Sequence, residues 1–152
     1  YKDQTDLCLN DIVLNKGALA RMIELQIFIN GQEVTRLKGD GLILSSPTGS
    51  TAYSLSAGGP IVHPAVETII LTPICPHTLS FRPLLIPADS NIQIKLLTPE
   101  EQVYITIDGQ RGHGLDKNET IEVRKSPLEL KLVTSPWRSY YNLVKEKLGW
   151  AE

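Results

Sequence analysis

The stretch Met22-Ile23-Glu24-Leu25-Gln26-Ile27-Phe28-Ile29, followed by Asn30-Gly31, decides the fold class. Apolar and polar residues alternate through most of it, and a period of two indicates a β-strand with one buried face. Asn-Gly between two such runs is the strongest short-range signal for a hairpin, because both turn residues need a positive φ. We therefore expect residues 34–38 to return as the partner strand.

Short strand candidates continue along most of the chain. They lie at residues 7–14, 41–45, 68–75, 84–86, 92–97, 103–107, 120–125 and 128–134. The alternation is clean in 92–96 and 128–132, where one face is apolar and the other polar. Asp108-Gly109 and residues 116–118 supply turns. The sequence thus predicts a mainly β domain with several sheets, arranged like a β-sandwich.

Two helices are expected among the strands. A short helix of small residues, 51–57, follows the turn Pro47-Thr48-Gly49-Ser50. The second begins with Ser135 as N-cap and Pro136 in the first position, and ends at Gly149. Its apolar stripe, which we expect to lie on the sheet, comprises Trp137, Tyr140, Tyr141, Val144 and Leu148.

Composition narrows the class of protein to a globular domain. The 152 residues carry 15 Lys and Arg against 17 Asp and Glu, a net charge of −2, which argues against a nucleic-acid-binding face. A hydrophobic content of 41% with 21% charged residues excludes a disordered chain. No apolar run reaches the length of a membrane span. We therefore expect neither nucleic acid nor membrane as a partner.

The two cysteines indicate the redox environment of the protein, and the first residue indicates whether the sequence is a piece of a longer one. Cys8 and Cys75 lack the Cys/His spacing of a zinc site and are too few for a disulfide scaffold. We therefore expect a reduced, cytoplasmic environment. The sequence begins at Tyr1, without an initiator Met or a signal-peptide pattern, and we expect it to be a piece of a longer protein.

Residues 39–60 are where the sequence predicts a ligand site. Six hydroxyl side chains lie between Ser45 and Tyr53, at a turn from a strand into a helix. Backbone N–H groups at a helix start favour a polar or anionic ligand, and hydroxyls can read the edge of a base. Tyr53 can also pack against a ring. The pattern alone fits a Ser/Thr-capped helix with nothing bound equally well.

Several catalytic signatures are absent from the sequence. It contains no P-loop, no G-x-G-x-x-G and no H-E-x-x-H. Composition leaves a Ser/His/Asp triad open, but Gly-x-Ser-x-Gly is also absent. His63, His77 and His113 do not form a ligand cluster in the sequence, so we expect no metal site in this chain.

Five blocks of the sequence resemble NAD kinases. The longest runs from Gly39-Asp40-Gly41 through Pro47-Thr48-Gly49-Ser50-Thr51-Ala52-Tyr53 to Ser56-Ala57-Gly58-Gly59-Pro60. The other four are Asn10-Asp11, residues 72–83, Ile107-Asp108-Gly109-Gln110 and Lys147-Leu148-Gly149-Trp150. Together the blocks extend the resemblance over essentially the whole chain.

The resemblance implies a kinase that transfers the terminal phosphate of ATP, or of polyphosphate in some members, to the adenosine-ribose 2′-hydroxyl of NAD, giving NADP. It implies that residues 1–152 are the C-terminal NAD-binding β domain. The N-terminal α/β domain would carry a Gly-Gly-Asp-Gly motif with the catalytic base. Gly39-Asp40-Gly41 lacks the first Gly of that motif, so the base is expected upstream of Tyr1 and the chain alone is expected to be inactive. Mg²⁺ bound with ATP and assembly as a dimer or tetramer are also implied.

The resemblance also implies individual site residues. Asn10 and Asp11 would bind the ribose, with Asp11 standing where the family usually has Glu. Thr48, Thr51 and Ala52 would meet the adenine edge, and Asp40 would reach the ligand of a neighbouring subunit. The full expected set is Asn10, Asp11, Arg21, Lys38, Asp40, Thr48, Thr51, Ala52, Tyr53, Ser54, Leu55, Ser56, Cys75 and Gln110.

Two alternatives remain open from the sequence. One is a non-catalytic nucleotide-binding or oligomerisation module with the same fold. The other is the C-terminal domain of a related lipid kinase of the diacylglycerol kinase type. The run Thr48-Gly49-Ser50-Thr51-Ala52-Tyr53 argues against the lipid kinase, because it suits an adenine better than an acyl chain.

Overall fold

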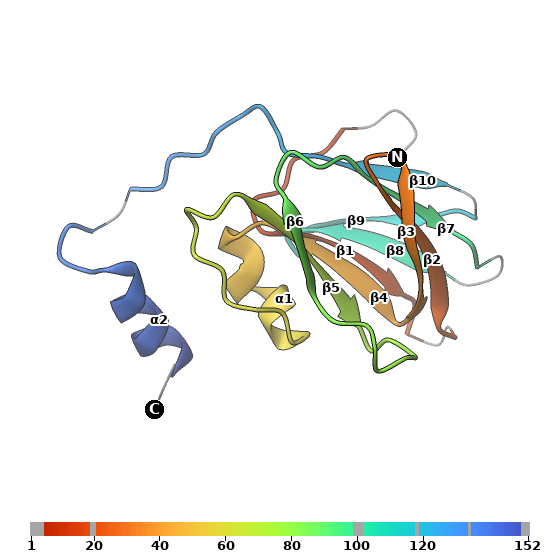
Figure 1. Cartoon of the computed structure of the whole chain (residues 1–152), viewed down its shortest axis with the longest axis horizontal. Helices are drawn as coiled ribbons and strands as arrows, with labels where there is room; N and C mark the ends of the chain where they lie inside the picture. Colours follow the sequence, from red (N-terminus) through yellow and green to blue (C-terminus); the bar gives the residue numbers. More distant parts are fainter. Residues whose placement is uncertain (1–4, 19–20, 99–101, 118, 134, 150–152) are drawn as a thin grey trace.

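Ten strands form two antiparallel sheets in the computed structural model, which describes residues 5–18, 21–98, 102–117, 119–133 and 135–149. The larger sheet has the order β6-β5-β4-β1-β8-β9 and the smaller one the order β10-β7-β2-β3. Figure 1 shows the two sheets stacked as a sandwich. The strands of the larger sheet are β1 Asp11–Lys16, β4 Gly41–Ser45, β5 Thr68–Ile74, β6 Leu84–Pro87, β8 Val103–Ile107 and β9 Arg111–Leu115. Those of the smaller sheet are β2 Ile23–Ile29, β3 Gln32–Gly39, β7 Ile92–Leu96 and β10 Thr120–Val123.

The hairpin predicted at Asn30-Gly31 is confirmed. Asn30 has φ 52° and Gly31 has φ 80°, and Ile29 pairs with Gln32 across the two-residue turn. The inward residues of β2, such as Leu25 and Ile27, are buried in a core that both sheets share. The apolar residues of this alternating pattern therefore face the core, as predicted.

The short helix predicted after the hydroxyl-rich turn is also present. The 3₁₀ turn η1, Thr48–Thr51, leads into α1, Tyr53–Ser56, and both lie between β4 and β5. Figure 1 shows this pair beside the end of the larger sheet where β4 finishes. The two antiparallel sheets likewise confirm the predicted mainly β fold with several sheets.

Three strand predictions need correction. The first strand runs over 11–16 and not 7–14, because backbone groups of residues 9–11 bond to Asp108. Residues 128–133 form no strand, and residue 134 lies outside the described part. β9, Arg111–Leu115, was not predicted, because its Arg-Gly-His-Gly lacks apolar alternation.

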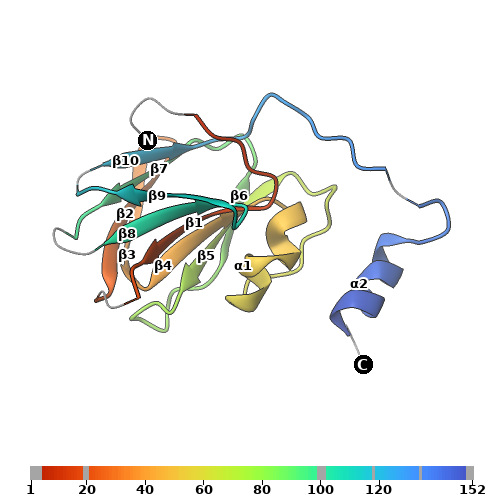
Figure 2. The ribbon, with the colours of Figure 1, turned by 180° about the vertical axis from the view of Figure 1, so that it is seen from behind.

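The C-terminal helix differs from its prediction at its start and in its contacts. α2 spans Tyr140–Leu148, with Ser139 as N-cap accepting from Asn142 N at 3.2 Å, so the predicted start at residues 135–136 is wrong. Gly149 ends the helix with φ 58°, as predicted. Figures 1 and 2 show α2 standing off the sandwich rather than lying on a sheet. Within the described residues, no helix is both long and apolar enough to cross a membrane.

α2 contacts the loop that follows α1. The Tyr140 hydroxyl donates to Val62 O at 3.3 Å, and the Tyr140 ring meets His63 edge to face with centroids 4.4 Å apart. Val144 is buried, whereas Trp137 and Tyr141 remain exposed. Among the described residues, the aromatic stripe therefore does not lie on either sheet.

Candidate functional site

Most of the predicted site residues meet at one end of the larger sheet, here called the near end. It is formed by the start of β1, by η1 and α1 after β4, and by the β8–β9 turn. Asp11 pairs with Ser45 of β4, and Ile12 pairs with Ile107 of β8. This pairing brings together segments about 35 and about 100 residues apart along the chain, as antiparallel sheets allow.

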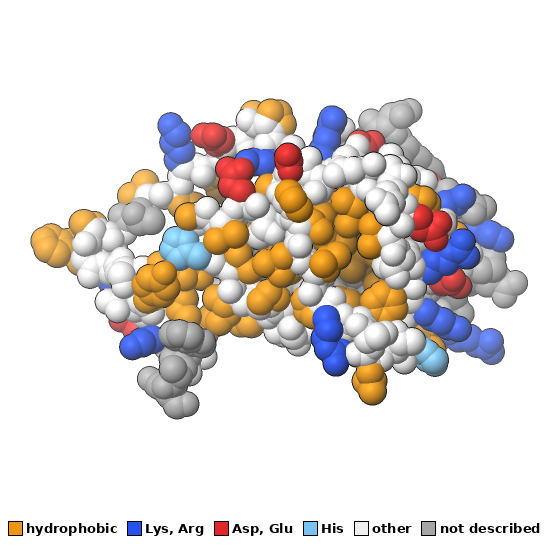
Figure 3. Space-filling model, viewed as in Figure 1, with side chains coloured by type: hydrophobic (Ala, Val, Ile, Leu, Met, Phe, Trp, Pro, Cys, Tyr) orange, Lys and Arg blue, Asp and Glu red, His pale blue; other side chains and the backbone are white. Residues whose placement is uncertain are grey.

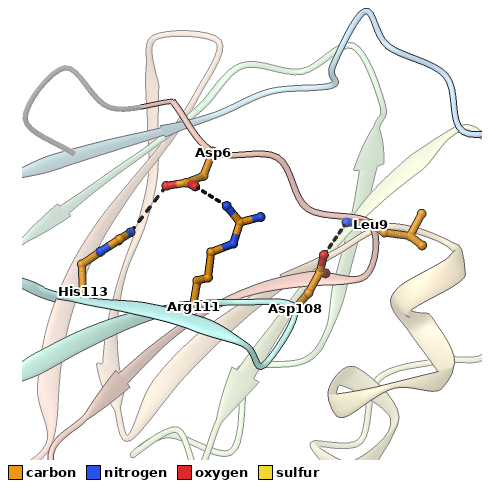
Figure 4. A network of polar contacts seen from close by, with 5 residues as sticks. All are labelled: Asp6, Leu9, Asp108, Arg111 and His113. Atoms are coloured by element: carbon orange, nitrogen blue, oxygen red, sulfur yellow. Dashed lines mark hydrogen bonds and ion pairs between the residues drawn. The ribbon is translucent and has the colours of Figure 1, made fainter.

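Asp108 fixes the chain that enters the near end. Its carboxylate accepts from Leu9 N at 2.9 Å, Asn10 N at 2.7 Å and Asp11 N at 3.2 Å, and its own N–H donates to Asp11 O at 3.0 Å. Figure 4 shows the carboxylate turned toward the Leu9 amide. Asn10 and Asp11, the predicted ribose pair, thus have a fixed backbone. The sequence marked Asp108 as a turn residue and missed this anchoring role.

The two carboxyl groups at the near end have pKa values shifted in opposite directions. Burial acts to raise the pKa of Asp108, but the three backbone N–H donors and Arg111 prevail and lower it. The pKa of Asp11 is raised, first by burial and then by the charge of Asp108, although the backbone N–H of Tyr53 opposes this. Asp108 is therefore an anchor that is ionised at neutral pH, and Asp11 is the more easily protonated acid of the two.

Cys8 lies beside the same carboxylates. Partial burial of the thiol, followed by the charges of Asp108 and Asp11, raises its pKa to about 11. A thiol with this pKa stays protonated at neutral pH, and the thiol is a much poorer nucleophile than the thiolate. No reactive role for Cys8 follows from this position.

A second polar contact holds the same N-terminal segment on the sheet. The Asp6 carboxylate lies 3.2 Å from Arg111 Nη1 and 3.4 Å from His113 Nε2 (Figure 4). Both partners belong to β9. Asp6 and Asp108 therefore tie residues 6–11 to β9 and to the β8–β9 turn.

Gly49 lets η1 approach the ribose pair closely. A Cβ on Gly49 would lie 2.0 Å from Asn10 O, a distance that no side chain tolerates. Ser46 joins the same backbone, because its N–H donates to Asn10 O at 2.9 Å and its hydroxyl donates to Leu9 O at 2.6 Å. The turn into η1 is thus packed directly on the start of β1.

The hydroxyl-rich segment divides into structural and outward-facing side chains. Ser50 and Ser54 are fully buried; the Ser50 hydroxyl accepts from Val62 N at 3.0 Å, and Ser54 bonds to Thr72 Oγ1 at 2.8 Å. The side chain of Ser54, a predicted site residue, is therefore turned into the core and cannot meet a ligand. The residues that keep exposed or partly exposed side chains are Thr48, Thr51, Ala52, Tyr53, Leu55 and Ser56.

Gln110 joins the near end, but four other predicted residues do not. Gln110 is exposed in the β8–β9 turn, one residue from Gly109. The far group, defined as Arg21, Lys38, Asp40 and Cys75, lies at the opposite end of β1, where Asn15 pairs with Gly41 and Gly41 with Ile74. Five strand steps separate these ends, about 17 Å. One compact ligand at the near end therefore does not meet both groups.

Backbone atoms of neighbouring strands pack closely around the two glycines that flank Asp40. A Cβ on Gly39 would lie 2.9 Å from Ile74 O, and one on Gly41 would lie 2.1 Å from Leu14 O. Between them, Asp40 Oδ1 lies 3.4 Å from Lys16 Nζ. The two glycines of Gly39-Asp40-Gly41 therefore serve strand packing, and the acid points to a surface ion pair.

Two cavities lie around the segment that joins β5 to β6. Their volumes are about 290 and about 300 Å³, and both are lined by Pro73, Phe81, Arg82 and Pro83. Figure 3 shows hydrophobic side chains gathered on the face over β5 and β6. Neither cavity is lined by residues 10–11, 48–56 or 110, although the second is also lined by Ala57 and Gly58, which directly follow α1.

The described residues supply no cluster of three or more His, Cys, Asp or Glu side chains placed to hold a metal ion. The donor set that a Mg²⁺ ion bound with ATP prefers is made of carboxylate and phosphate oxygens. The carboxylates at the near end are instead committed to backbone N–H groups. The part of the chain that the structure describes therefore does not fit a metal site.

Comparison with known families agrees with this geometry. The model of the ATP-NAD kinase C-terminal domain matches residues 9–135. The chain belongs to the NAD kinase family. It is 53% identical to the NAD kinase of Magnetococcus marinus over 144 residues, which cover 95% of this chain and 48% of the relative. It is 50% identical to the NAD kinase of Citrifermentans bemidjiense over 145 residues, or 95% of this chain and 50% of the relative.

Solved structures of the NAD kinase family share the fold. Yeast NADH kinase complexed with NADH matches with a TM-score of 0.86 and 38% identity, over 95% of this chain and 44% of that one. The NAD kinase from Archaeoglobus fulgidus in complex with ATP matches with a TM-score of 0.72 and 33% identity, over 80% of this chain and 46% of that one. The chain spans about half the length of the curated relatives it matches.

Proposed function

We propose that this chain is the C-terminal NAD-binding domain of an NAD kinase, which phosphorylates the adenosine-ribose 2′-hydroxyl of NAD with ATP or polyphosphate to give NADP. The observation that carries the proposal is the convergence of three distant segments, at residues 10–11, 48–56 and 110, on the near end. A helix cap without a ligand needs only local residues. The family membership and the NADH complex of the yeast relative support the same ligand class.

The adenine would lie against the outward side chains of η1 and α1. Thr51 is exposed, Thr48 is partly exposed and Tyr53 is 42% exposed. Threonine hydroxyls can donate to or accept from a base edge, and an exposed tyrosine ring gives a flat apolar surface for a purine. These neutral contacts suit a domain whose net charge is −2.

The ribose would bond to Asn10 and Asp11. The Asp11 residue is only 4% exposed, and its pKa is raised by burial and by Asp108. A ribose hydroxyl that donates to this carboxylate would satisfy a partly desolvated acceptor, and such charge-assisted bonds are the stronger ones. We expect the bond to weaken in acid, when Asp11 takes up a proton.

The far group would act on a second ligand, held by a neighbouring subunit in a dimer or tetramer. The support is its separation of about 17 Å from the near end along β1. Lys38 and Cys75 are exposed and Asp40 is partly exposed, so all three can be reached from outside the domain. The test is the oligomeric state in solution together with the effect of Asp40→Ala on NAD affinity, which should appear only in the assembled form.

Phosphoryl transfer would need groups that the near end lacks. A ribose hydroxyl is a weak nucleophile and needs a base within hydrogen-bond reach. The Asp108 carboxylate is already engaged by three backbone N–H groups, and Asp11 would be occupied as the acceptor that holds the ribose. The base would therefore come from the part of the relatives that this chain does not match, and this domain would hold and orient NAD.

A crystal of the chain soaked with NAD tests the site directly. We expect electron density for the adenosine half beside Thr51 and Tyr53, with the ribose within hydrogen-bond distance of Asn10 or Asp11. Ordered NAD in the cavities around Phe81, with the near end empty, would contradict the assignment. A parallel soak of a Tyr53→Ala crystal is the control, because NAD density that persists there does not depend on the tyrosine ring.

A further inference from the structure

α1 is too short to hold its own place on the sheet. The helix comprises only Tyr53–Ser56, and no side chain caps its start at Ala52. Isolated helices of fewer than about 12 residues are marginal in water, so one turn has no stability of its own. Contacts with the rest of the domain therefore determine where α1 lies, and with it the ring of Tyr53 that the proposed function places against the adenine.

Ser54 makes the buried contact of α1. It is the buried residue of this helix, and its hydroxyl lies 2.8 Å from Thr72 Oγ1. Thr72 is 0% exposed and pairs with Ile43 of β4, so the sheet fixes its backbone. The preceding residue, Leu71, belongs to the core that both sheets share. Because side chains alternate along a strand, Thr72 points to the opposite face, where it meets α1.

Gly59 closes the space around the two hydroxyls. Its N–H donates to Ser54 O at 2.8 Å. A Cβ on Gly59 would lie 2.3 Å from Ser54 Oγ and 2.9 Å from Thr72 Oγ1. Two fully buried hydroxyls cannot exchange their mutual bond for one to water, so each depends on the other. A hydrogen bond is also directional, unlike an apolar contact, and it therefore fixes the orientation of α1.

The start of α1 is attached to the proposed ribose pair. The backbone N–H of Tyr53 donates to the carboxylate of Asp11. Asp11 lies on β1 and Thr72 on β5, with β4 between these two strands. α1 is thus held at two points across three strands. The contact at Asp11 would change when a ribose binds there, whereas the contact at Thr72 would hold α1 with and without a ligand.

We propose that Thr72 is a positioning residue of the NAD site: its hydroxyl, acting through Ser54, orients α1 so that Tyr53 meets the adenine. The proposal rests on the proposed function and adds to it a residue that touches no ligand. Without the bond between the two hydroxyls, α1 would also occupy other orientations. The apparent affinity for NAD falls in proportion to the fraction of molecules that hold α1 in place.

Calorimetric titration of NAD into single and double variants tests this proposal. Thr72→Val keeps the shape of the side chain but removes the hydroxyl, so the affinity should fall about fivefold to tenfold. Ser54→Ala should cause a similar loss. The double variant leaves neither hydroxyl unsatisfied, so its stability in urea should recover while its affinity stays low. Thr72→Ser brings back the hydroxyl and should restore the affinity to within about twofold.

Thr68→Val is the matched control on the same strand. Thr68 is 6% exposed, but its hydroxyl donates to Ile86 O of β6 at 2.7 Å and not to α1. This variant should lose stability without losing affinity for NAD. Equal losses of affinity in Thr68→Val and Thr72→Val would overturn the proposal. So would an affinity that recovers together with the stability in the double variant, because the role of Thr72 would then be structural alone.

Hydrogen exchange separates this proposal from the proposed function. The N–H groups of residues 57–59 donate to backbone carbonyls of α1, so they report on the helix without any ligand. They should exchange about tenfold faster in Thr72→Val but not in Thr68→Val. Unchanged exchange in Thr72→Val would overturn the proposal. Faster exchange in a chain that binds no NAD would overturn the proposed function instead. If Thr72→Val does not fold, Ser54→Ala decides by the same two measurements.

Discussion

Asp108 is the residue on which the near end depends most. One carboxylate organises three successive backbone N–H groups, and the residues it holds include the proposed ribose pair. Its own φ of 48° is a conformation that Asp and Asn tolerate better than most residues. Asn at this position would keep the backbone shape but would present an NH₂ group toward one of the three N–H donors.

We therefore predict that Asp108→Asn destabilises the chain by about 1–2 kcal/mol at pH 7, from the loss of charge-assisted bonds. Because the pKa of Asp108 is lowered from 3.8 by folding, the unfolded chain binds its proton first as the pH falls. The stabilisation is present above 3.8 and is lost as the pH falls through the lower folded value. Urea unfolding of both proteins should thus differ less at pH 2 than at pH 7.

The control for this prediction is Asp89→Asn, an exposed acid in the turn between β6 and β7. It should change the free energy of unfolding by less than about 0.5 kcal/mol at either pH. A loss from Asp108→Asn no larger than this would show that the carboxylate does not anchor residues 9–11.

The strands with strong alternation or turn signals could be predicted from the sequence. Residues 22–31 specify a strand and its turn locally, so the predictions of β2 and of the hairpin were correct. β9 could not be predicted from its own residues, because its pairing partner β8 and the turn at Asp108-Gly109 create it. The prediction of a strand at residues 128–134 fails for the opposite reason: the residues alternate like a strand, but no described strand pairs with residues 128–133.

The same distinction applies to the candidate site. The hydroxyl-rich turn is visible in the sequence, whereas the inward orientation of Ser54 depends on Thr72 of β5. The split between near end and far group depends on strand register, which a list of motif positions does not contain.

The hairpin between β2 and β3 gives a prediction at the level of one element. Gly31→Ala should cost about 1 kcal/mol of unfolding free energy, since φ is 80° and an L-residue is strained there. Gly114→Ala on β9 is the matched control, because a Cβ at either position meets no atom within 4 Å. Thermal or urea unfolding of both variants checks this; equal stabilities would mean that the left-handed turn does not limit the hairpin.

At the scale of the whole molecule, the domain would bind the substrate without converting it. We predict that the purified 152-residue chain forms no NADP from NAD and ATP, because the proposed base lies outside it. An enzymatic assay specific for NADP, with the full-length NAD kinase of Magnetococcus marinus as positive control, measures this. NADP formation by the short chain alone would place the base among its own residues.

The central claim is that NAD binds at the near end through η1 and α1. Calorimetric titration of NAD into the chain, Tyr53→Ala and Tyr104→Ala tests it most directly. The two tyrosines are matched in exposure, 42% and 44%, but Tyr104 pairs with Asn15 toward the far end of β1. We predict a loss in affinity of about tenfold for Tyr53→Ala, or about 1.4 kcal/mol, and almost none for Tyr104→Ala. Equal losses in the two variants, or none in either, would contradict the account.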